Sequence, residues 1–364
     1  MKIAIVGSRG IPAKYGGFET CAEELGIGLV NKGHKVLVSC RGYLYPQKPL
    51  SYKGVELCYP PSIPGKITDT FSHTFFSIFR TLFWAPDVIL LFNSANSPLI
   101  LLPRLFGKKV VINVDGLEWR RAKWGKTAKL YYKFAEFFSA AAADVVISDA
   151  AAIKDYYLWK YRRQTVYIPY GAPLNESRNP EILRLYNLEK NGYFFIGSRL
   201  EPENHQDIAV EAFRMSSTDK LLVIAGGANW KSPYVESLKK AGDKRIRFLG
   251  PVYEPGHMEE LHLNAYAYIH GNEVGGTNPA LLKAMGSGNC VLALDVPFNR
   301  EVLGDAGLYF RTPSELKNKI DFLLASPGRT EGIGQDARER ARKLYRWEKV
   351  VEDYEKVFLK LCNG

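Results

Sequence analysis

Short apolar runs separated by polar turns follow one another along the first half of the chain. Between the runs, apolar residues recur at helical spacing, as Cys21, Leu25 and Leu29 do after the first run. Apolar runs of this length are typical of strands buried on both faces, and strands that alternate with helices form parallel, doubly wound sheets. The expected strands are Lys2–Val6, Lys35–Ser39, Val88–Phe92, Lys109–Val114, Asp144–Ile147 and Val166–Pro169.

The same alternation begins again after a polar stretch at 173–190, which we interpret as a linker. The pattern therefore predicts an α/β protein with two Rossmann-like, doubly wound domains that face each other across a cleft. We expect an N-terminal domain at 1–172, a C-terminal domain at 173–345 and a final helix at 346–364 that packs back toward the N-terminal domain. The later expected strands are Tyr193–Ile196, Lys220–Ala225, Arg247–Leu249, Ala265–Ile269 and Cys290–Leu294, and residues 334–361 are expected to be helical.

One segment of the second half, residues 265–294, has the pattern of a phosphate-binding turn. A strand leads into a turn that contains Gly275 and Gly276, and Asn278 and Pro279 suit the start of a helix. The free N–H groups and the dipole at a helix N-terminus attract phosphate, and glycines allow a ligand close to the backbone. The alternative is a tight strand–helix turn that binds nothing.

Composition narrows the class of protein. The chain has 364 residues and is 46% hydrophobic, which is enough for two buried cores. The cysteines are scattered and lack a C-x-x-C pair, which favours a reducing compartment without a disulfide framework or a zinc site. Residues 1–8 predict a strand rather than a signal peptide, and no apolar run reaches the ~18 residues of a membrane span. The cysteines are Cys21, Cys40, Cys58, Cys290 and Cys362.

The net charge of +11 lies entirely in one half. Residues 1–172 contain 23 basic and 12 acidic side chains, whereas residues 173–364 contain 26 of each. This asymmetry indicates that the first half meets an anionic surface or ligand. The alternative is a bias toward solubility without any partner.

Two loops that follow expected strands of the first half are candidates for function. Loop 7–20 lacks the G-x-G-x-x-G spacing of a dinucleotide site, but Gly16 and Gly17 offer adjacent N–H groups at a helix start. Loop 115–124 combines Asp115 and Glu118 with basic residues and two tryptophans, a mixture that favours function over structure alone.

Residues 120–138 predict a basic helix that is rich in aromatic residues. Together with the apolar stretch Phe71–Trp84, it suits an interfacial surface on an anionic membrane. The alternative is a core helix with a solvated cationic face.

Four segments, taken together and in this order, resemble the GT-B glycosyltransferases, specifically the retaining family 4. Within that family the chain resembles the bacterial rhamnosyltransferase subgroup of capsule and O-antigen assembly, over essentially its whole length. The segments are GSRGIPAKYGGFET at 7–20, VDGLEWRRAKW at 114–124, GSRLEPENH at 197–205 and HGNEVGGTNPALLKAM at 270–285.

The resemblance implies that the domain at 1–172 binds the acceptor and the domain at 173–345 binds the nucleotide-sugar donor, and it implies a role for each segment. Gly16 and Gly17 would approach the donor diphosphate, Arg199 would bind it, and Asp115 would lie beside the reacting sugar. Asp115, Arg199 and Glu273 are the implied catalytic residues. Further donor and nucleotide contacts are implied for Gly250, Pro251, Val252, Tyr253, His270, Gly275, Gly276, Thr277, Asn278 and Lys283, and acceptor contacts for Tyr15, Glu118, Trp119 and Arg120.

The chain departs from the family at three of these positions. Where the family usually has two glutamates eight positions apart, this chain has Gly275 and Lys283. The second glutamate commonly binds the nucleotide ribose, and a lysine cannot accept hydrogen bonds from ribose hydroxyls. The subgroup has a His-x-x-Glu pair instead of the first glutamate, matched here by His270 and Glu273. Asn204 stands where many relatives have a diphosphate-binding lysine.

The implied activity is transfer of a sugar, L-rhamnose from dTDP-rhamnose as the best match, to a saccharide on a polyprenyl-diphosphate carrier. We expect retention of configuration by front-face transfer, without a metal or another cofactor, because Arg199 and helix N–H groups can stabilise the leaving diphosphate. No Asp-x-Asp sequence occurs. The expected location is the cytoplasm, peripherally at the inner face of the cell membrane, and nucleic acid is not an expected partner. The alternatives are a nucleotide-sugar epimerase of GT-B build and a non-catalytic component of a polysaccharide assembly complex.

Overall fold

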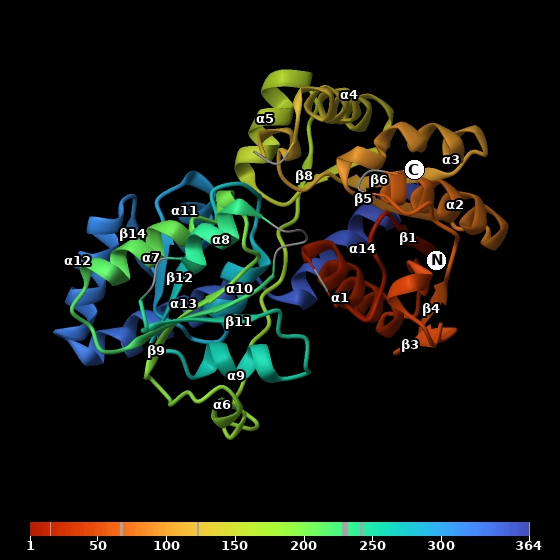
Figure 1. The fold of residues 1–364 in the computed structure, drawn as a ribbon. Coiled ribbons are helices and arrows are strands. Elements are labelled where there is room, and N and C mark those ends of the chain that lie inside the picture. Colours follow the sequence, from red (N-terminus) through yellow and green to blue (C-terminus); the bar gives the residue numbers. More distant parts are fainter. Residues whose placement is uncertain (15, 66–67, 122–123, 228–231, 241–242, 364) are drawn as a thin grey trace. The chain divides into compact units, whose positions relative to one another are not determined.

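The computed structural model describes the whole chain except residues 15, 66–67, 122–123, 228–231, 241–242 and 364 (Figure 1). The chain forms two compact units. Unit 1 consists of Met1–Gly171 and Trp347–Gly364, and unit 2 consists of Ala172–Arg346. Each unit contains one sheet of mainly parallel strands, with helices packed against it.

The sheet of unit 1 has the strand order β3-β4-β2-β1-β5-β6-β7-β8, and only the short β3 runs antiparallel to its neighbour. The order reverses beside β1, and ligands of open α/β sheets bind at the carboxyl ends of the strands near such a reversal. The strands are β1 (Lys2–Val6), β2 (Lys35–Ser39), β3 (Ser51–Tyr52), β4 (Val55–Cys58), β5 (Val88–Phe92), β6 (Lys109–Asn113), β7 (Val145–Ser148) and β8 (Val166–Tyr167).

The helices of unit 1 belong to two layers because right-handed crossovers toward opposite edges of a sheet lie on opposite faces. In one layer α1 (Gly17–Asn31) packs against α14 (Trp347–Asn363) so closely that a Cβ on Gly28 would lie 2.5 Å from Val351. The other layer contains four helices, of which the first three contact η2 (Ser94–Ile100) and the fourth contacts the third. They are α2 (Thr68–Trp84), α3 (Leu101–Leu105), α4 (Lys126–Ala142) and α5 (Ala151–Tyr161), and short 3-10 turns form η1 (Gly42–Leu44) and η3 (Glu118–Arg120).

The sheet of unit 2 is parallel, with the order β11-β10-β9-β12-β13-β14. Its core includes Phe194, Phe213 and Leu292, which are fully buried. The strands are β9 (Tyr193–Gly197), β10 (Leu221–Ala225), β11 (Ile246–Gly250), β12 (Ala267–His270), β13 (Val291–Leu294) and β14 (Leu308–Phe310). The helices are α6 (Ile182–Leu185), η4 (Pro202–Asn204), α7 (Gln206–Met215), α8 (Pro233–Lys239), α9 (His257–Leu263), α10 (Pro279–Gly286), α11 (Pro297–Leu303), α12 (Pro313–Leu324) and α13 (Pro327–Leu344).

Several predicted elements differ from the structure. The helix predicted at 334–361 is two helices, α13 and α14, which the chain divides at 345–346. The basic helix predicted at 120–138 begins only at Lys126. The stretch 173–190, predicted as a linker, contains α6 and is held to unit 2, because the Glu260 carboxylate accepts from the backbone N–H groups of Arg178 and Asn179 at 2.7 and 2.8 Å.

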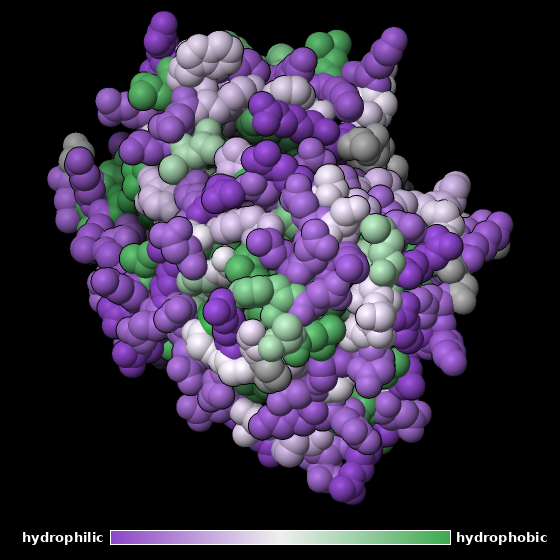
Figure 2. All heavy atoms as spheres, turned by 90° about the vertical axis from the view of Figure 1, so that its left-hand side faces the viewer, coloured by the Kyte–Doolittle hydropathy of each residue, from purple (hydrophilic) through white to green (hydrophobic). Residues whose placement is uncertain are grey.

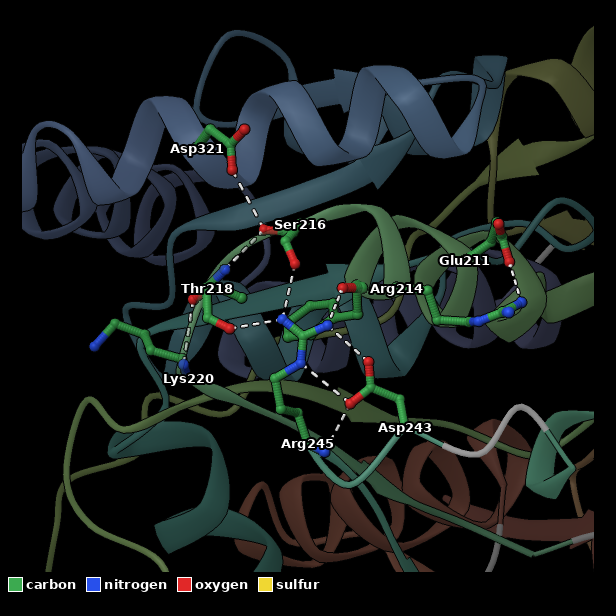
Figure 3. A network of polar contacts seen from close by, with 9 residues as sticks. Glu211, Arg214, Ser216, Thr218, Lys220, Asp243, Arg245 and Asp321 are labelled. Carbon is green, nitrogen blue, oxygen red and sulfur yellow. Dashed lines mark hydrogen bonds and ion pairs between the residues drawn. The ribbon is translucent and has the colours of Figure 1, made fainter.

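A single arginine joins the end of α7 and the residues after it to the segment 243–245 of unit 2 (Figure 3). The guanidinium of Arg245 donates to the carbonyl oxygens of Phe213, Ser216 and Thr218 at 2.7–2.8 Å. The same group pairs with the Asp243 carboxylate at 2.7 Å. Arg245 therefore binds carbonyl groups in the last turn of α7 and in the segment that follows it.

Among the residues that the structure describes, no helix is long and apolar enough to cross a membrane. Figure 2 shows one face of the molecule, on which hydrophilic side chains predominate and hydrophobic ones form a small group near the centre.

Candidate functional site

Backbone hydrogen bonds join the loops that follow β9, β10 and β11 at the carboxyl edge of the unit 2 sheet. Ser198 N donates to Ala225 O at 3.1 Å, and Gly226 N donates to Gly250 O at 2.8 Å. A Cβ on Gly226 would lie 1.9 Å from Ser198 O, so no larger residue fits there. The three loops therefore form one connected surface, at the edge where parallel sheets bind ligands.

The loop that carries Arg199 is fixed by neutral side chains. The backbone carbonyl of Arg199 accepts from Asn204 Nδ2 at 2.7 Å and from Gln206 Nε2 at 2.8 Å. Asn204 is buried and supports the loop through its side-chain amide. Arg199 then supplies a cation at this edge of the sheet.

The loop after β12 packs directly on the Arg199 loop. A Cβ on Gly271 would lie 2.3 Å from Asn204 O, and Glu273 N donates to Glu203 O at 3.0 Å. The Glu273 carboxylate also pairs with His205 Nε2 at 3.0 Å, and both side chains are partly exposed. The sequence-predicted residues Arg199 and Glu273 therefore lie on two loops that contact each other.

The helix that follows this loop, α10, begins as the sequence predicts. Asn278 is its N-cap, with Oδ1 accepting from Ala280 N at 2.9 Å, and Pro279 opens the first turn. Among the described residues, no atom lies within 4 Å of the position of a Cβ on Gly275. Thr277 is buried. The first N–H groups of α10 are thus presented next to a glycine that leaves room for a ligand.

His270 ends β12 beneath this loop and is 1% exposed. Its ring stacks on Tyr268, with centroids 6.0 Å apart, and neither ring nitrogen has a hydrogen-bond partner among the described residues. Burial lowers the pKa of His270 to about 3, so the imidazole is neutral near pH 7. A neutral imidazole offers one donor and one acceptor rather than a charge for a phosphate.

The segment from Gly250 to Tyr253 differs in character from the fixed loops. Gly250 has φ 74°, a left-handed conformation that favours glycine, and Pro251 packs against Gly227. Val252 is half-buried, whereas Tyr253 is 64% exposed. A flat, exposed ring beside a rigid turn suits stacking against a nucleotide base.

Lys283 lies on α10, where its Nζ pairs with Glu259 Oε1 of α9 at 3.4 Å. Both side chains are about one-third exposed, so the pair contributes little to stability. The pairing gives this position a local partner other than Glu273.

The glycine loop of unit 1, residues 7–20, is held by two carboxylates of α1. Glu19 accepts from Arg9 N at 2.8 Å, and Glu23 accepts from Ala13 N at 2.5 Å. Burial raises the pKa of Glu19, which is 6% exposed. Gly16 is the N-cap of α1 and Gly17 its first residue, so their N–H groups lie at a helix start as predicted. Glu19 and Glu23 were not predicted to hold this loop, although their spacing of four residues places them on one face of the expected helix.

Asp115 follows β6 in a left-handed conformation, with φ 54°, which residues other than glycine rarely adopt. Its N–H donates to Asn113 Oδ1 at 3.0 Å, and the Asn113 amide donates to the Tyr354 hydroxyl at 2.7 Å. Burial, with a contribution from the Asp115 charge, raises the pKa of Tyr170. A conformation held in this way positions the Asp115 carboxylate at the carboxyl edge of the sheet.

The residues predicted to face the acceptor make structural contacts. Glu118 accepts from Arg121 Nε at 2.6 Å and from Trp124 Nε1 at 3.0 Å. Trp119 Nε1 donates to Glu136 at 3.0 Å, and Arg120 lies over the Trp119 ring at 5.4 Å. Tyr15 lies outside the described residues, as does Lys123 of the basic segment.

Glu136, which the sequence analysis did not single out, organises that region. It is 3% exposed and also accepts from Tyr156, Lys160 and Tyr161 at 2.6–3.0 Å. A buried carboxylate requires such partners. The described residues contain no group of three or more His, Cys, Asp or Glu side chains arranged to hold a metal ion.

The two halves of the chain match two different protein families. Residues 180–340 match the family described as "Glycosyl transferases group 1". Residues 1–65 and 102–173 match one described as "Domain of unknown function (DUF1972)". An uncharacterized glycosyltransferase of Methanocaldococcus jannaschii is 30% identical over 101 residues, which are 26% of this chain and 26% of that protein.

Solved structures share the fold over the whole chain. Sucrose-phosphate synthase from Thermosynechococcus elongatus superposes with a TM-score of 0.80 at 19% identity, covering 99% of this chain and 98% of that one. HepE from Anabaena, solved in complex with UDP, superposes with a TM-score of 0.78 at 16% identity, covering 99% of this chain and 100% of that one. The fold is therefore GT-B, with two Rossmann-like sheets of parallel strands.

Proposed function

We propose that this chain, which has the GT-B fold and carries a glycosyl transferases group 1 domain at 180–340, transfers a sugar from a nucleoside-diphosphate donor. The observation that carries the proposal is the joined set of loops in unit 2. It brings the Arg199 loop into contact with the loop that leads to the N-terminus of α10. HepE, which has the same fold, binds UDP in its solved structure, and this supports a nucleotide of that class as the ligand here.

The chemistry follows from charge. Departure of a nucleoside diphosphate develops negative charge, which the Arg199 guanidinium and the first N–H groups of α10 would stabilise. Within unit 2, Glu273 would orient the sugar of the donor, because its loop contacts the Arg199 loop. We propose front-face transfer with retention, in which a leaving phosphate oxygen takes the acceptor proton, without a metal or another cofactor.

The finer proposal follows the four motifs of the sequence. Their resemblance to rhamnosyltransferases of capsule and O-antigen assembly favours dTDP-rhamnose as donor and a polyprenyl-diphosphate-linked saccharide as acceptor. Such an acceptor lies in the membrane, so we also propose peripheral association with the inner face of the cell membrane.

Unit 1 has a surface that suits such an association. Large apolar side chains are exposed on α2, on α3 and the residue after it, and on α4, and each of these three helices contacts η2. Exposed Lys126 and Lys133 flank them on α4. We call this the α2–α4 surface; its apolar residues are Phe76, Phe79, Phe83, Leu101, Leu105, Phe106, Leu130, Phe134 and Phe137.

A transfer assay tests the activity. Purified protein is incubated with labelled dTDP-rhamnose or a UDP-sugar and with a polyprenyl-diphosphate-linked saccharide. We expect label in the lipid fraction only when both substrates are present. Label in a free, epimerised nucleotide sugar without any acceptor would instead indicate an epimerase.

One second candidate is a non-catalytic protein that binds nucleotide sugars. Lys283 favours it, because this lysine stands where the resemblance predicts a ribose-binding glutamate and is paired with Glu259 instead. This candidate predicts that nucleotide binds while no label is transferred to any acceptor.

A further inference from the structure

A buried polar cluster lies in unit 1 at the carboxyl end of β2, apart from the residues discussed so far. It consists of Ser39, Arg41, Asp69 and His73, which come from the end of β2, the turn after it and the first turns of α2. None of the four is more than 8% exposed. We call it the Arg41–Asp69 cluster.

Only part of the polar capacity of the cluster is used. Arg41 Nη1 pairs with Asp69 Oδ2 at 2.6 Å, and Arg41 Nη2 donates to Thr70 Oγ1 at 3.0 Å. The remaining buried atoms have no hydrogen-bond partner among the described residues. They are Arg41 Nε, Asp69 Oδ1 and Ser39 Oγ, whereas the His73 ring interacts with the backbone of Cys40. Buried polar atoms are rarely left unbonded in proteins, so this concentration in one place indicates a site for a polar ligand.

The unbonded atoms define the chemistry of that ligand. Arg41 Nε can only donate and Asp69 Oδ1 can only accept, whereas the Ser39 hydroxyl does both. The charges of Arg41 and Asp69 cancel, and burial, together with the Arg41 charge, lowers the pKa of His73 to about 4. A phosphate brings acceptors and negative charge, which Asp69 would oppose. Hydroxyl groups, which donate and accept, match the whole set.

An exposed aromatic ring lies beside the cluster. Tyr43 of η1 is 60% exposed, yet its hydroxyl donates to Asp69 Oδ2 at 2.9 Å, which fixes the direction of the side chain. An aromatic face whose orientation is held by a buried carboxylate suits the apolar face of a sugar ring.

The cluster also adjoins the glycine loop that we expect to approach the donor. Arg41 N donates to Arg9 O at 3.0 Å, and the Tyr45 hydroxyl donates to Pro12 O at 3.0 Å. A sugar held at the cluster would therefore lie next to residues 9–12 of that loop.

We propose that the Arg41–Asp69 cluster and the ring of Tyr43 form a saccharide-binding subsite that holds hydroxyl groups of the sugar acceptor. That the saccharide is an acceptor rests on the proposed function; that the subsite binds a saccharide does not. The subsite is distinct from loop 115–124, where the sequence predicts acceptor contacts.

Saturation-transfer difference NMR on the full chain tests the subsite. The probes are free L-rhamnose, D-glucose, D-galactose and N-acetyl-D-glucosamine. For at least one of them we expect transfer that falls about fivefold or more in Tyr43→Ala and in Asp69→Asn. Tyr43→Phe keeps the ring but loses its bond to Asp69, so its signal should be intermediate. Trp159→Ala removes an aromatic ring of unit 1 that is 72% exposed, and it should leave the signal unchanged.

Other results would overturn the subsite. These are no transfer to any of the four sugars, equal transfer in wild type and Tyr43→Ala, or displacement of the sugar by inorganic pyrophosphate. Because the Tyr43 side chain is largely exposed, Tyr43→Ala decides the matter even if Asp69→Asn does not fold. Calorimetric binding of UDP and dTDP to the same samples tests the proposed function separately, so failure of one is distinguishable from failure of the other.

Discussion

Gly16 illustrates how one residue can be required for two physical reasons. Its φ of 93° is left-handed, and a Cβ there would lie 2.6 Å from Glu19 Oε2. Glu19 in turn holds the backbone of Arg9. The glycine, the buried carboxylate and the loop backbone therefore depend on one another, and the N–H groups at the start of α1 keep one position.

Replacement of a buried histidine tests how pH acts on this protein. Burial lowers the pKa of His270 to about 3, below the ~6.5 of an unfolded chain. Between these values the unfolded state binds the proton more readily, so stability falls as the pH falls from about 6.5 toward 3. At pH 5 one such histidine lowers the free energy of unfolding by ~2 kcal/mol. In urea titrations at pH 7 and pH 5, His270→Gln should therefore lose less stability on acidification than wild type. An equal loss in both proteins would contradict the buried, neutral state of His270.

The Lys283–Glu259 ion pair predicts that the affinity for nucleotide depends on which of the two positions carries the positive charge. Lys283→Glu introduces the carboxylate that the resemblance predicts at this position but places it opposite Glu259, and like charges at this distance oppose each other. The double variant Glu259→Lys with Lys283→Glu keeps the pair in reversed order. We expect the double variant to bind UDP or dTDP more tightly than the single one by calorimetry, with a difference of up to ~1 kcal/mol. If the single variant binds as tightly as the double one, Glu259 does not govern this position.

At the scale of elements, the carboxyl edge of unit 2 is stiff because its loops bond to one another. Close backbone contacts leave no room for a larger residue at Gly226 or Gly271. The Asn204 side chain donates a hydrogen bond to the backbone of Arg199. A preorganised edge loses little entropy when a ligand binds.

Arg245 should be essential for the stability of unit 2. Its removal leaves three carbonyl groups and the Asp243 carboxylate without a shared partner (Figure 3). We expect Arg245→Ala to lower the free energy of unfolding by about 3 kcal/mol. Arg214→Ala, which removes a half-exposed arginine paired with Glu211, should have an effect within ~0.5 kcal/mol. Equal effects of the two variants in urea denaturation would contradict a stabilising role for the hydrogen bonds of Arg245.

The strands were predictable from sequence because burial on both faces leaves an unbroken apolar run. Lys2–Val6, Lys35–Ser39 and Val88–Phe92 match the structure at both ends. Three strands were missed: β3 and β14, which are too short to show a pattern, and β4, in which the exposed Glu56 interrupts the apolar residues. The division between α13 and α14 was missed because apolar spacing continues across 345–346, and neither glycine nor proline marks the end.

The candidate site was predictable only in part. Glycine turns and the start of α10 have local sequence signals, and the structure shows them as expected. The pairing of Glu273 with His205, and that of Lys283 with Glu259, depends on contacts between loops or helices distant in sequence. The Arg41–Asp69 cluster likewise joins residues 28 positions apart. No local pattern encodes such contacts.

At the scale of the whole molecule, the two sheets belong to units of different charge. The excess of basic residues lies in 1–172, and the apolar α2–α4 surface lies within the same part of the chain. Apolar area and positive charge act together on an anionic membrane.

Vesicle sedimentation tests the α2–α4 surface. Each basic residue near an anionic surface contributes ~1 kcal/mol, and salt weakens this attraction. Binding should require anionic lipid and weaken with salt. It should also fall when Lys126, Lys129 and Lys133 are replaced by Glu, and when Phe134 and Phe137 are replaced by Ser. A control with Lys190, Lys239 and Lys240 of unit 2 changed to Glu should bind as wild type does. Equal recovery with neutral and anionic vesicles at low salt would refute the electrostatic account.

The central claim is that the carboxyl edge of unit 2 binds a nucleoside diphosphate through Arg199. Isothermal titration calorimetry with UDP and dTDP on wild type, Arg199→Ala and Arg214→Ala tests it most directly. A charge-assisted contact to phosphate contributes ~1.5–3 kcal/mol, so Arg199→Ala should bind about ten- to hundredfold more weakly, and Arg214→Ala should bind as wild type does. Absence of binding by either nucleotide, or equal affinity in Arg199→Ala and wild type, would contradict the account.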